Sequence, residues 1–200
     1  NIDTNVPATT EKRDKSPRLA PELESSLKRY GSYTELKRAA LIIAAAQTDK
    51  RSVKKLREEF LKIDTDASGT INEKELCAAL GVAELDTPTK DVFAKLDHDR
   101  SGEVHYHEFL AATLEAHELL NEEVLQDTFD RMDHDDSGVI SRENLRSLLG
   151  SRASDELVET LMQDGDLKRN GHVDYEEFSR VMRSGASGSV DSLEDVAPMF

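Results

Sequence analysis

The chain has 200 residues and a formal net charge of −15, which suits one or two small domains with modest cores. This charge argues against nucleic acid as the main partner, because phosphate binding requires a basic surface, and it suits cations or basic peptides. The longest apolar run, residues 39–46, is far too short for a transmembrane segment of roughly 20 residues, and the single cysteine, Cys77, fits a reducing, cytoplasmic compartment.

The N-terminal part of the chain is basic, whereas the remainder is strongly acidic. Residues 1–20 are polar, contain Pro7 and Pro17 and show no apolar period, so we expect a disordered linker there. The sequence begins with Asn1 rather than methionine. We therefore expect a fragment of a longer protein, which leaves membrane association through a missing N-terminus open.

In residues 21–50 the apolar residues recur at the spacing of an amphipathic helix, with a break at Gly31. Ser32 and Glu35 have the spacing of a capping box, in which the serine side chain begins a helix over residues 32–47. We expect a long amphipathic helix before the body of the protein. Its apolar side is predicted to collect Leu36, Ala40, Ile43 and Ala44, with Lys37 and Arg38 on one flank.

A repeat covers most of the remaining chain. Four glycines, each preceded by acidic or hydroxyl residues, recur at intervals of 33, 36 and 33 residues, with apolar residues at helical spacing on both sides. The pattern predicts an all-α fold of four helix–loop–helix units in two lobes, residues 51–116 and 117–183, and a flexible tail at residues 184–200. The glycines are Gly69, Gly102, Gly138 and Gly171.

The first two loops have the full oxygen pattern of a calcium site. Oxygen-bearing residues stand at alternate positions of a twelve-residue loop, a glycine permits the bend at the sixth position, and a glutamate at the twelfth supplies two oxygens. Ca²⁺ takes six to eight hard oxygen ligands, so both loops are predicted calcium sites. The predicted ligands are Asp64, Asp66, Ser68, Thr70, Asn72 and Glu75 in the first loop and Asp97, Asp99, Ser101, Glu103, His105 and Glu108 in the second, with Thr70 and Glu103 acting through their carbonyl oxygens.

The third loop, residues 133–144, ends in Asn144, where a bidentate glutamate is expected. Because Asn144 offers one neutral oxygen, we expect weak calcium binding, with Mg²⁺ as an alternative since it needs no bidentate carboxylate. An empty loop that is kept for its packing explains the sequence equally well. The candidate ligands are Asp133, Asp135, Ser137, Val139 and Asn144.

The fourth loop, residues 166–177, carries Lys168 at the third position, where an acidic or amide ligand is expected. An ammonium group there repels a bound cation unless the side chain turns away. We therefore predict a weaker site, so that the chain holds two calcium ions and at most four. The candidate ligands are Asp166, Asn170, His172, Asp174 and Glu177.

The eighth residue of each loop is β-branched and can pair with its neighbour as a short strand. We expect Ile71 to pair with Val104 and Ile140 to pair with Val173. Each loop then depends on its partner, so that an imperfect loop is retained because the other one packs against it.

The remaining reactive residues are assigned structural roles. Cys77 is expected in the core rather than in redox chemistry. The histidines, among them His105 and His107, have no cysteine partners and no zinc spacing, so a transition-metal site is not predicted. Three methionines fall at core-facing positions, where calcium sensors often line a target groove, although plain packing explains them equally well: Met132, Met162 and Met182.

Residues 51–183 resemble the EF-hand pattern. The preceding segment "SSLKRYGSYTELKRAALIIAAAQ" resembles the junction that follows the catalytic domain in calcium-dependent protein kinases (CDPK) of plant and protist type, and "SGVISRENLRSLLG" and "NGHVDYEEF" resemble their third and fourth hands. The resemblance implies a calmodulin-like regulatory domain, preceded by an autoinhibitory junction at residues 21–50. It also implies a Ser/Thr kinase catalytic domain in the same full-length chain, which calcium frees by rearranging the lobes around the junction helix.

The chain has none of the kinase motifs, so no catalysis is expected of it alone. A free-standing calmodulin-like sensor, a phosphatase regulatory subunit or a calcium buffer are the alternatives. The basic helix at residues 32–47 favours the attached regulator, because a free sensor needs no built-in target. Asn144 and Lys168 depart from the family pattern, and we therefore expect the first lobe to carry the calcium signal while the second serves mainly for docking.

Overall fold

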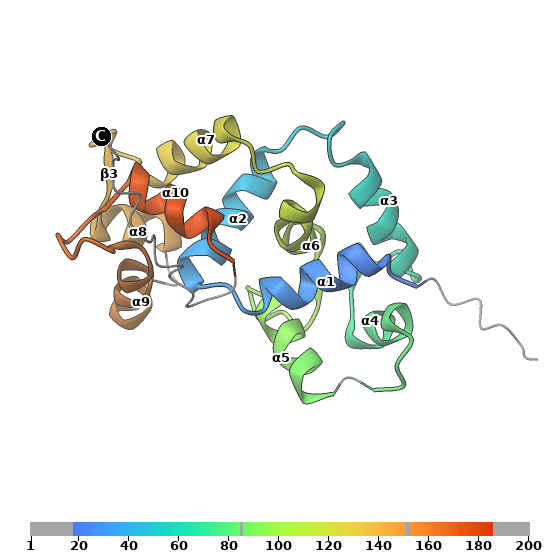
Figure 1. Ribbon diagram of the computed structural model, residues 1–200. Coiled ribbons are helices and arrows are strands. Elements are labelled where there is room, and N and C mark those ends of the chain that lie inside the picture. Colours follow the sequence, from blue (N-terminus) through green and yellow to red (C-terminus); the bar gives the residue numbers. More distant parts are fainter. Residues whose placement is uncertain (1–17, 85, 151–152, 186–200) are drawn as a thin grey trace, which may run out of the picture.

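Ten α-helices and four two-residue strands make up the part of the chain that the computed structural model describes, residues 18–84, 86–150 and 153–185 (Figure 1). Residues 1–17 of the predicted linker and residues 186–200 of the predicted tail lie outside these ranges. The all-α prediction is confirmed, and none of the described helices is long and apolar enough to cross a membrane. In chain order the elements are α1 (Pro21–Tyr30), α2 (Glu35–Gln47), α3 (Lys54–Ile63), β1 (Thr70–Ile71), α4 (Glu73–Leu80), α5 (Thr87–Leu96), β2 (Val104–His105), α6 (Tyr106–Thr113), the 3₁₀ helix η1 (Glu115–His117), α7 (Glu122–Met132), β3 (Val139–Ile140), α8 (Arg142–Leu149), α9 (Asp155–Gly165), β4 (Val173–Asp174) and α10 (Tyr175–Arg183).

Residues 21–50 form two helices, α1 and α2, rather than one long helix. The hydroxyl of Ser32 donates to the carbonyl oxygen of Arg29 at 2.6 Å, at the end of α1. Thr34 is the N-cap of α2, and its Oγ1 accepts from the backbone amide of Lys37 at 3.3 Å. The predicted capping role of Ser32 is therefore wrong. A threonine in extended backbone directly before the helix takes that position.

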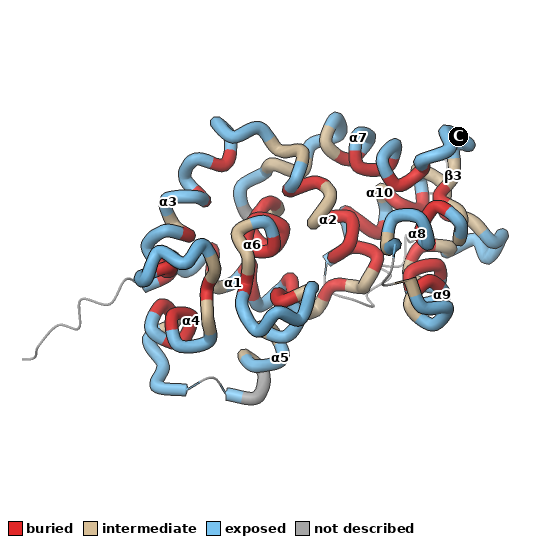
Figure 2. Tube along the Cα trace, turned by 180° about the vertical axis from the view of Figure 1, so that it is seen from behind, coloured by how far each residue is buried: buried red, intermediate tan, exposed pale blue. Residues whose placement is uncertain are grey.

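Helix α2 lies between the two lobes, in contact with α6 of the first lobe and with α7 and α9 of the second (Figure 1). Leu36, Ala40 and Ala44 are fully buried, as predicted for the apolar side, whereas Ile43, the fourth predicted residue, is only half-buried. Lys37 and Arg38 are buried as well, with only 1 % and 6 % of their surface exposed. Buried residues follow α2 and the adjacent α6 through the middle of the molecule (Figure 2). An amphipathic pattern does not reveal this enclosure, because the additional cover comes from distant helices.

Helix α1 packs on the first lobe, against α5, α6 and η1. Leu23, Leu27 and Tyr30, the three residues whose helical spacing predicts this helix, are all buried. The basic N-terminal segment is thus anchored at both of its helices, α1 on one lobe and α2 between the two.

Each lobe is tied together by one antiparallel strand pair. In the first lobe Ile71 is in register with Val104, and in the second lobe Ile140 is in register with Val173. All four side chains are buried, with at most 2 % of their surface exposed. The predicted pairing of the eighth loop residues is confirmed, so the two loops of a lobe share one small hydrophobic link.

The two lobes repeat the same aromatic packing. Phe60 and Phe109 in the first lobe lie edge to face with ring centroids 5.5 Å apart, and Phe129 and Phe178 do the same in the second lobe, also at 5.5 Å. The buried apolar residues form one connected cluster, because α2 joins the two lobes. Cys77 lies in this core as predicted, and so do the three methionines Met132, Met162 and Met182.

Candidate metal centres in the four loops

Every loop opens with an aspartate whose carboxylate is held by the backbone amides of the fifth and sixth residues. In the first loop Asp64 accepts from the amides of Ser68 and Gly69, both at 3.0 Å. The sixth-position glycines have φ angles of +83° to +89°, a left-handed conformation that explains why glycine stands there. The same two contacts, at 2.7 to 3.1 Å, hold Asp97, Asp133 and Asp166.

The fifth and seventh residues place two further predicted ligand oxygens side by side. In each of the first three loops the serine hydroxyl at the fifth position donates to the carbonyl oxygen at the seventh. In the fourth loop the Oδ1 of Asn170 accepts from the amide of His172 at 3.3 Å. The serine contacts are Ser68 to Thr70 at 3.2 Å, Ser101 to Glu103 at 3.0 Å and Ser137 to Val139 at 3.0 Å.

The first loop gathers three carboxylates around one point. Ligand atoms of Asp64, Asp66 and Glu75 all lie within 4.8 Å of one another. Glu75, at the start of α4, accepts from the amide of Thr65 through Oε1 at 2.8 Å and from the amide of Asn72 through Oε2 at 3.1 Å. Because Asp64 and Glu75 are only 5 % and 7 % exposed, their charges are poorly hydrated, and a bound cation would stabilise them.

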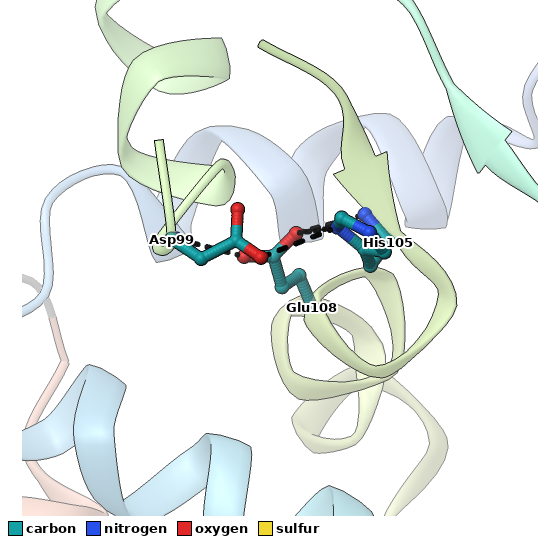
Figure 3. Close-up of side chains that lie close together, drawn as sticks. All are labelled: Asp99, His105 and Glu108. Carbon is teal, nitrogen blue, oxygen red and sulfur yellow. Dashed lines mark hydrogen bonds and ion pairs between the residues drawn. The ribbon is translucent and has the colours of Figure 1, made fainter. Parts of the chain in front are cut away.

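The second loop gathers Asp99, His105 and Glu108 in the same way, with ligand atoms within 4.8 Å of one another (Figure 3). Glu108 is fully buried at the start of α6. Its Oε1 accepts from the amide of His98 at 2.7 Å and its Oε2 from the amide of His105 at 2.8 Å. The twelfth-position glutamate therefore spans the second loop as it spans the first.

In the third loop, two candidate metal ligands are hydrogen-bonded by other residues of the loop. The Oδ1 of Asn144 accepts from the amide of Ser141 at 2.8 Å, so the asparagine keeps the contact that glutamate makes elsewhere. Its Nδ2 donates to Oδ1 of Asp135 at 3.1 Å. This hydrogen bond is the main reason why the pKa of Asp135 lies below its usual value. A neutral amide thus stabilises the third-position carboxylate where a metal ion would otherwise do so.

The fourth loop carries a cation of its own. Lys168 Nζ lies 2.6 Å from Oδ2 of Asp174, the predicted ninth-position ligand, and 2.9 Å from Oε2 of Glu176. The hydrogen bond from Lys168 is the first cause of the lowered pKa of Asp174, and these two carboxylates raise the pKa of Lys168. Glu177 still accepts from the amides of Lys168 and Asp174, at 2.7 and 3.1 Å. The loop therefore has the expected backbone frame, but an ammonium group competes for one of its ligands.

The two loops of the first lobe are joined by a contact that the sequence analysis did not anticipate. The hydroxyl of Thr70 donates to Oε2 of Glu103 at 2.6 Å. Both residues stand at the seventh position, directly before the paired residues Ile71 and Val104. Because the strands are antiparallel, Thr70 lies opposite His105, so its contact with Glu103 runs diagonally across the pair. The expected pairing of Ile71 with Val104 is the signal that would have placed the two side chains near each other. Since both also offer a carbonyl oxygen as a candidate ligand, the contact links the two centres.

A family model described as an EF-hand domain pair matches residues 32–114 and 122–183. The chain belongs to the EF-hand family. Both loop pairs fall within the matched residues, and the carboxylate frame found in each loop agrees with the assignment. EF-hand pairs bind Ca²⁺ through such loops, so this is a calcium-binding protein.

Curated relatives of this EF-hand chain are calcium-dependent protein kinases. Calcium-dependent protein kinase 9 of Arabidopsis thaliana is 34 % identical over 166 residues, which cover 80 % of this chain and 31 % of the relative. Calcium-dependent protein kinase 2 of Zea mays is 32 % identical over 166 residues, or 80 % and 32 %. Calcium-dependent protein kinase 7 of Oryza sativa subsp. japonica is 32 % identical over 174 residues, or 85 % and 32 %. The chain spans about one third of the length of these relatives.

Helix α2 is fixed between the EF-hand lobes by its charged residues. Lys37 Nζ lies 3.1 Å from Oε1 of Glu115, donates to the carbonyl oxygen of Ser184 at 2.7 Å, and stands 4.1 Å from the ring centroid of Tyr33. Burial lowers the pKa of Lys37, and the Glu115 carboxylate acts in the opposite direction. A lysine from α2 thus binds η1, between the lobes, and the residue that follows α10.

A second contact fixes the start of α2 to the second EF-hand lobe. The backbone amide of Leu36 donates to Oδ2 of Asp164, on α9, at 3.1 Å. This amide belongs to the first turn of α2, where backbone donors have no partner within the helix, so Asp164 supplies one from another element. Burial raises the pKa of Asp164, while the backbone amides act against that rise.

Proposed function

We propose that the chain is the calcium-sensing regulatory region of a Ser/Thr protein kinase. Calcium binding to its EF-hands changes its conformation and relieves the autoinhibition of a catalytic domain in the same full-length chain. The proposal is supported by relatives that are named calcium-dependent protein kinases and that match this chain over about one third of their own length. A cytoplasmic location belongs to the same proposal, in keeping with the buried free thiol of Cys77.

The difference between the two lobes carries the proposal that the first lobe is the sensor. In the first lobe, carboxylates converge in both loops, and three of them, Asp64, Glu75 and Glu108, are buried. In the second lobe, Asn144 and Lys168 already partner carboxylates of the loops. Calcium binding therefore releases more free energy in the first lobe, where the ion neutralises clustered charge. In the second lobe the ion must first displace Asn144 or Lys168 from the carboxylate that it binds.

The position of α2 suggests how the signal leaves the first lobe. Glu108 is both the twelfth-position ligand of the second loop and part of the first turn of α6. Helix α6 packs directly on α2. A calcium ion that draws Glu108 toward Asp97 and Asp99 shifts α6, and α2 must respond because a packed core does not absorb such a shift smoothly. Residues 32–47 are thus proposed as the internal partner of the EF-hands.

We propose that two calcium ions bind with high affinity and that the second lobe acts mainly as a docking element. Mg²⁺ in the third loop remains a prediction. The single side-chain oxygen of Asn144 already accepts hydrogen bonds from the amide and the hydroxyl of Ser141, at 2.8 and 2.7 Å. A metal ion would have to compete with both donors.

The test is made on the full-length protein with its own catalytic domain. Phosphorylation of a serine peptide should require Ca²⁺, and the double variant Glu75→Gln/Glu108→Gln should lose this activation. The matched control, Asp135→Asn/Glu177→Gln, changes two carboxylates of the second lobe and should retain most of it. A catalytic domain that is equally active with calcium and with chelator would contradict the proposal.

A calcium buffer and a free-standing sensor predict different results for the chain alone. A buffer barely opens, so calcium would not increase the binding of an apolar dye. A free sensor does not need residues 1–50, so their deletion would leave calcium affinity and compactness unchanged. The buried contacts of α2 with both lobes favour the attached regulator, for which the deletion should expose apolar surface and increase dye binding.

A further inference from the structure

His105 differs from the residues at the same place in the other three loops. Asn72, Ser141 and Asp174 each accept a hydrogen bond from the backbone amide three residues later, at 3.1, 3.1 and 2.9 Å, and so cap the exiting helix. The Nδ1 of His105 is buried and has no hydrogen-bond partner among the residues that the structure describes. A buried polar atom without a partner costs free energy, which a bound ligand would offset.

Asp99 and Glu108 flank this nitrogen, as Figure 3 shows. Nδ1 of His105 lies 3.6 Å from Oδ2 of Asp99 and 3.6 Å from Oε2 of Glu108. Two bonds of about 2.1 Å at the tetrahedral angle separate their ligand atoms by about 3.4 Å. A tetrahedral ion therefore matches both nitrogen–oxygen separations, and the ligand atoms of all three residues lie within 4.8 Å of one another.

The glutamate of this group is held in place by the backbone. Glu108 is fully buried, and the amides of His98 and His105 bind its two oxygens at 2.7 and 2.8 Å. An ionised carboxylate has about four lone-pair sites, so each oxygen can still accept a metal bond. Such backbone support keeps a ligand in position before the metal arrives.

We propose that the second loop binds a divalent transition cation, represented by Zn²⁺, through Nδ1 of His105 and the carboxylates of Asp99 and Glu108, in competition with Ca²⁺. The proposal rests on the second loop being a cation site, as proposed above. Imidazole suits Zn²⁺, whereas Ca²⁺ is bound by oxygen. The first loop has Asn72 in place of His105 and offers only oxygen, so the two neighbouring loops differ in the metal that they select.

The sequence analysis predicts no transition-metal site, because the histidines have no cysteine partners. One histidine nitrogen with two carboxylates is also a known kind of zinc ligand set. Because the strand pair and the Thr70–Glu103 hydrogen bond join the two loops, Zn²⁺ in the second loop would oppose paired calcium loading of the first lobe. The first lobe would then report calcium only when the transition cation is scarce.

The test uses the 200-residue chain with ¹⁵N-labelled histidine, titrated with Zn²⁺ alone near neutral pH. The Nδ1 signal of His105 should shift on binding. His105→Asn gives the second loop the side-chain ligands of the first and should weaken Zn²⁺ binding at least tenfold, with calcium affinity changed only a few-fold. His107→Asn is the matched control, because this exposed ring lies 5.7 Å from that of His105, and it should change neither affinity.

Unchanged zinc affinity in His105→Asn, or a zinc-induced shift at His107 but not at His105, would overturn the proposal. A calcium titration of the same sample tests the proposed function separately. If calcium binds the second loop while zinc leaves His105 unaffected, only the zinc site is wrong. If calcium binds neither loop of the first lobe, the calcium-sensing function is wrong as well.

Discussion

Asn144 donates a hydrogen bond from Nδ2 to Oδ1 of Asp135, at 3.1 Å, across the third loop. The last residue of the loop thus reaches the third-position carboxylate without a metal ion between them. In the first two loops a glutamate occupies this place and leaves its carboxylate charge available to a cation. The third loop therefore keeps the frame of a calcium site while it satisfies one of the site's ligands internally.

Replacing Asn144 by glutamate should create a calcium site in the third loop. The longer side chain can take the position that Glu75 has in the first loop, supply two oxygens, and remove the amide that now binds Asp135. We expect calorimetry to detect one more calcium ion than in the unchanged protein, with affinity for the third loop raised at least tenfold, about 1.4 kcal/mol. An unchanged number of bound ions would show that Asn144 is not what limits this loop.

Replacing Lys168 by serine should strengthen calcium binding in the fourth loop. The substitution frees Asp174 from its 2.6 Å ion pair and places a hydroxyl oxygen at the third position. Arg169→Ser is the control, because it removes the same charge from the adjacent exposed residue. Calorimetry should give a several-fold gain for Lys168→Ser only. Equal gains in the two variants would mean that net charge, rather than the freed ligand, governs the affinity.

Replacing Gly165 by alanine should weaken the packing of α2 against the second lobe. A methyl group there would lie 2.5 Å from Cδ2 of Leu36 and 2.7 Å from Cγ2 of Val173, well inside contact distance. We expect a loss of about 1–3 kcal/mol in the free energy of unfolding by urea, measured in chelator.

The control for Gly165→Ala is the double variant that also carries Leu36→Val. A shorter side chain on α2 relieves part of the overlap, so the two losses should not add. If the two losses in unfolding free energy add strictly, the alanine does not clash with Leu36, and the contact between Gly165 and Leu36 loses its support.

Lys37 and Glu115 should respond unequally to substitution. Lys37→Met replaces a buried charge by an apolar side chain of similar length, and Glu115 is 27 % exposed and can turn to water. Glu115→Ala instead leaves the buried ammonium with the carbonyl of Ser184 as its remaining hydrogen-bond acceptor among the described residues, at 2.7 Å. We expect Glu115→Ala to cost roughly 1–3 kcal/mol more unfolding free energy than Lys37→Met, since an unpaired buried charge is the costlier state. The reverse order in urea unfolding would contradict the described contact.

The loops and their strand pairs could be predicted because their information is local. Ligand spacing, the glycine bend and the eighth-position residues all lie within twelve consecutive positions, and the pairing of Ile140 with Val173 follows from two such loops. For Lys168 the sequence predicts only that its charge weakens the fourth site, unless the side chain turns away. Its ammonium group leaves the centre but pairs with a ligand six residues along the loop.

The environment of α2 could not be predicted because it depends on residues far along the chain. Lys37 is buried only because Glu115 and Ser184, from other parts of the chain, meet it there. A sequence pattern also does not decide between Ser32 and Thr34 as the N-cap of α2, since both are good capping residues and lie two positions apart. The sequence predicts His105 as a calcium ligand of the second loop. Its proposed role in zinc binding could not be predicted, because only the folded loop leaves its Nδ1 without a hydrogen-bond partner among the described residues.

The four sixth-position glycines allow the most direct test of the account. Each donates its amide to the first aspartate of its own loop, at 3.0, 2.8, 2.7 and 2.8 Å, so each amide signal reports one candidate calcium site. In a calcium titration followed by NMR, Gly69 and Gly102 should shift together and reach completion before Gly138 and Gly171 move. If Gly138 or Gly171 shifts first, or if all four shift in step, the first lobe is not the principal calcium sensor and the central claim is wrong.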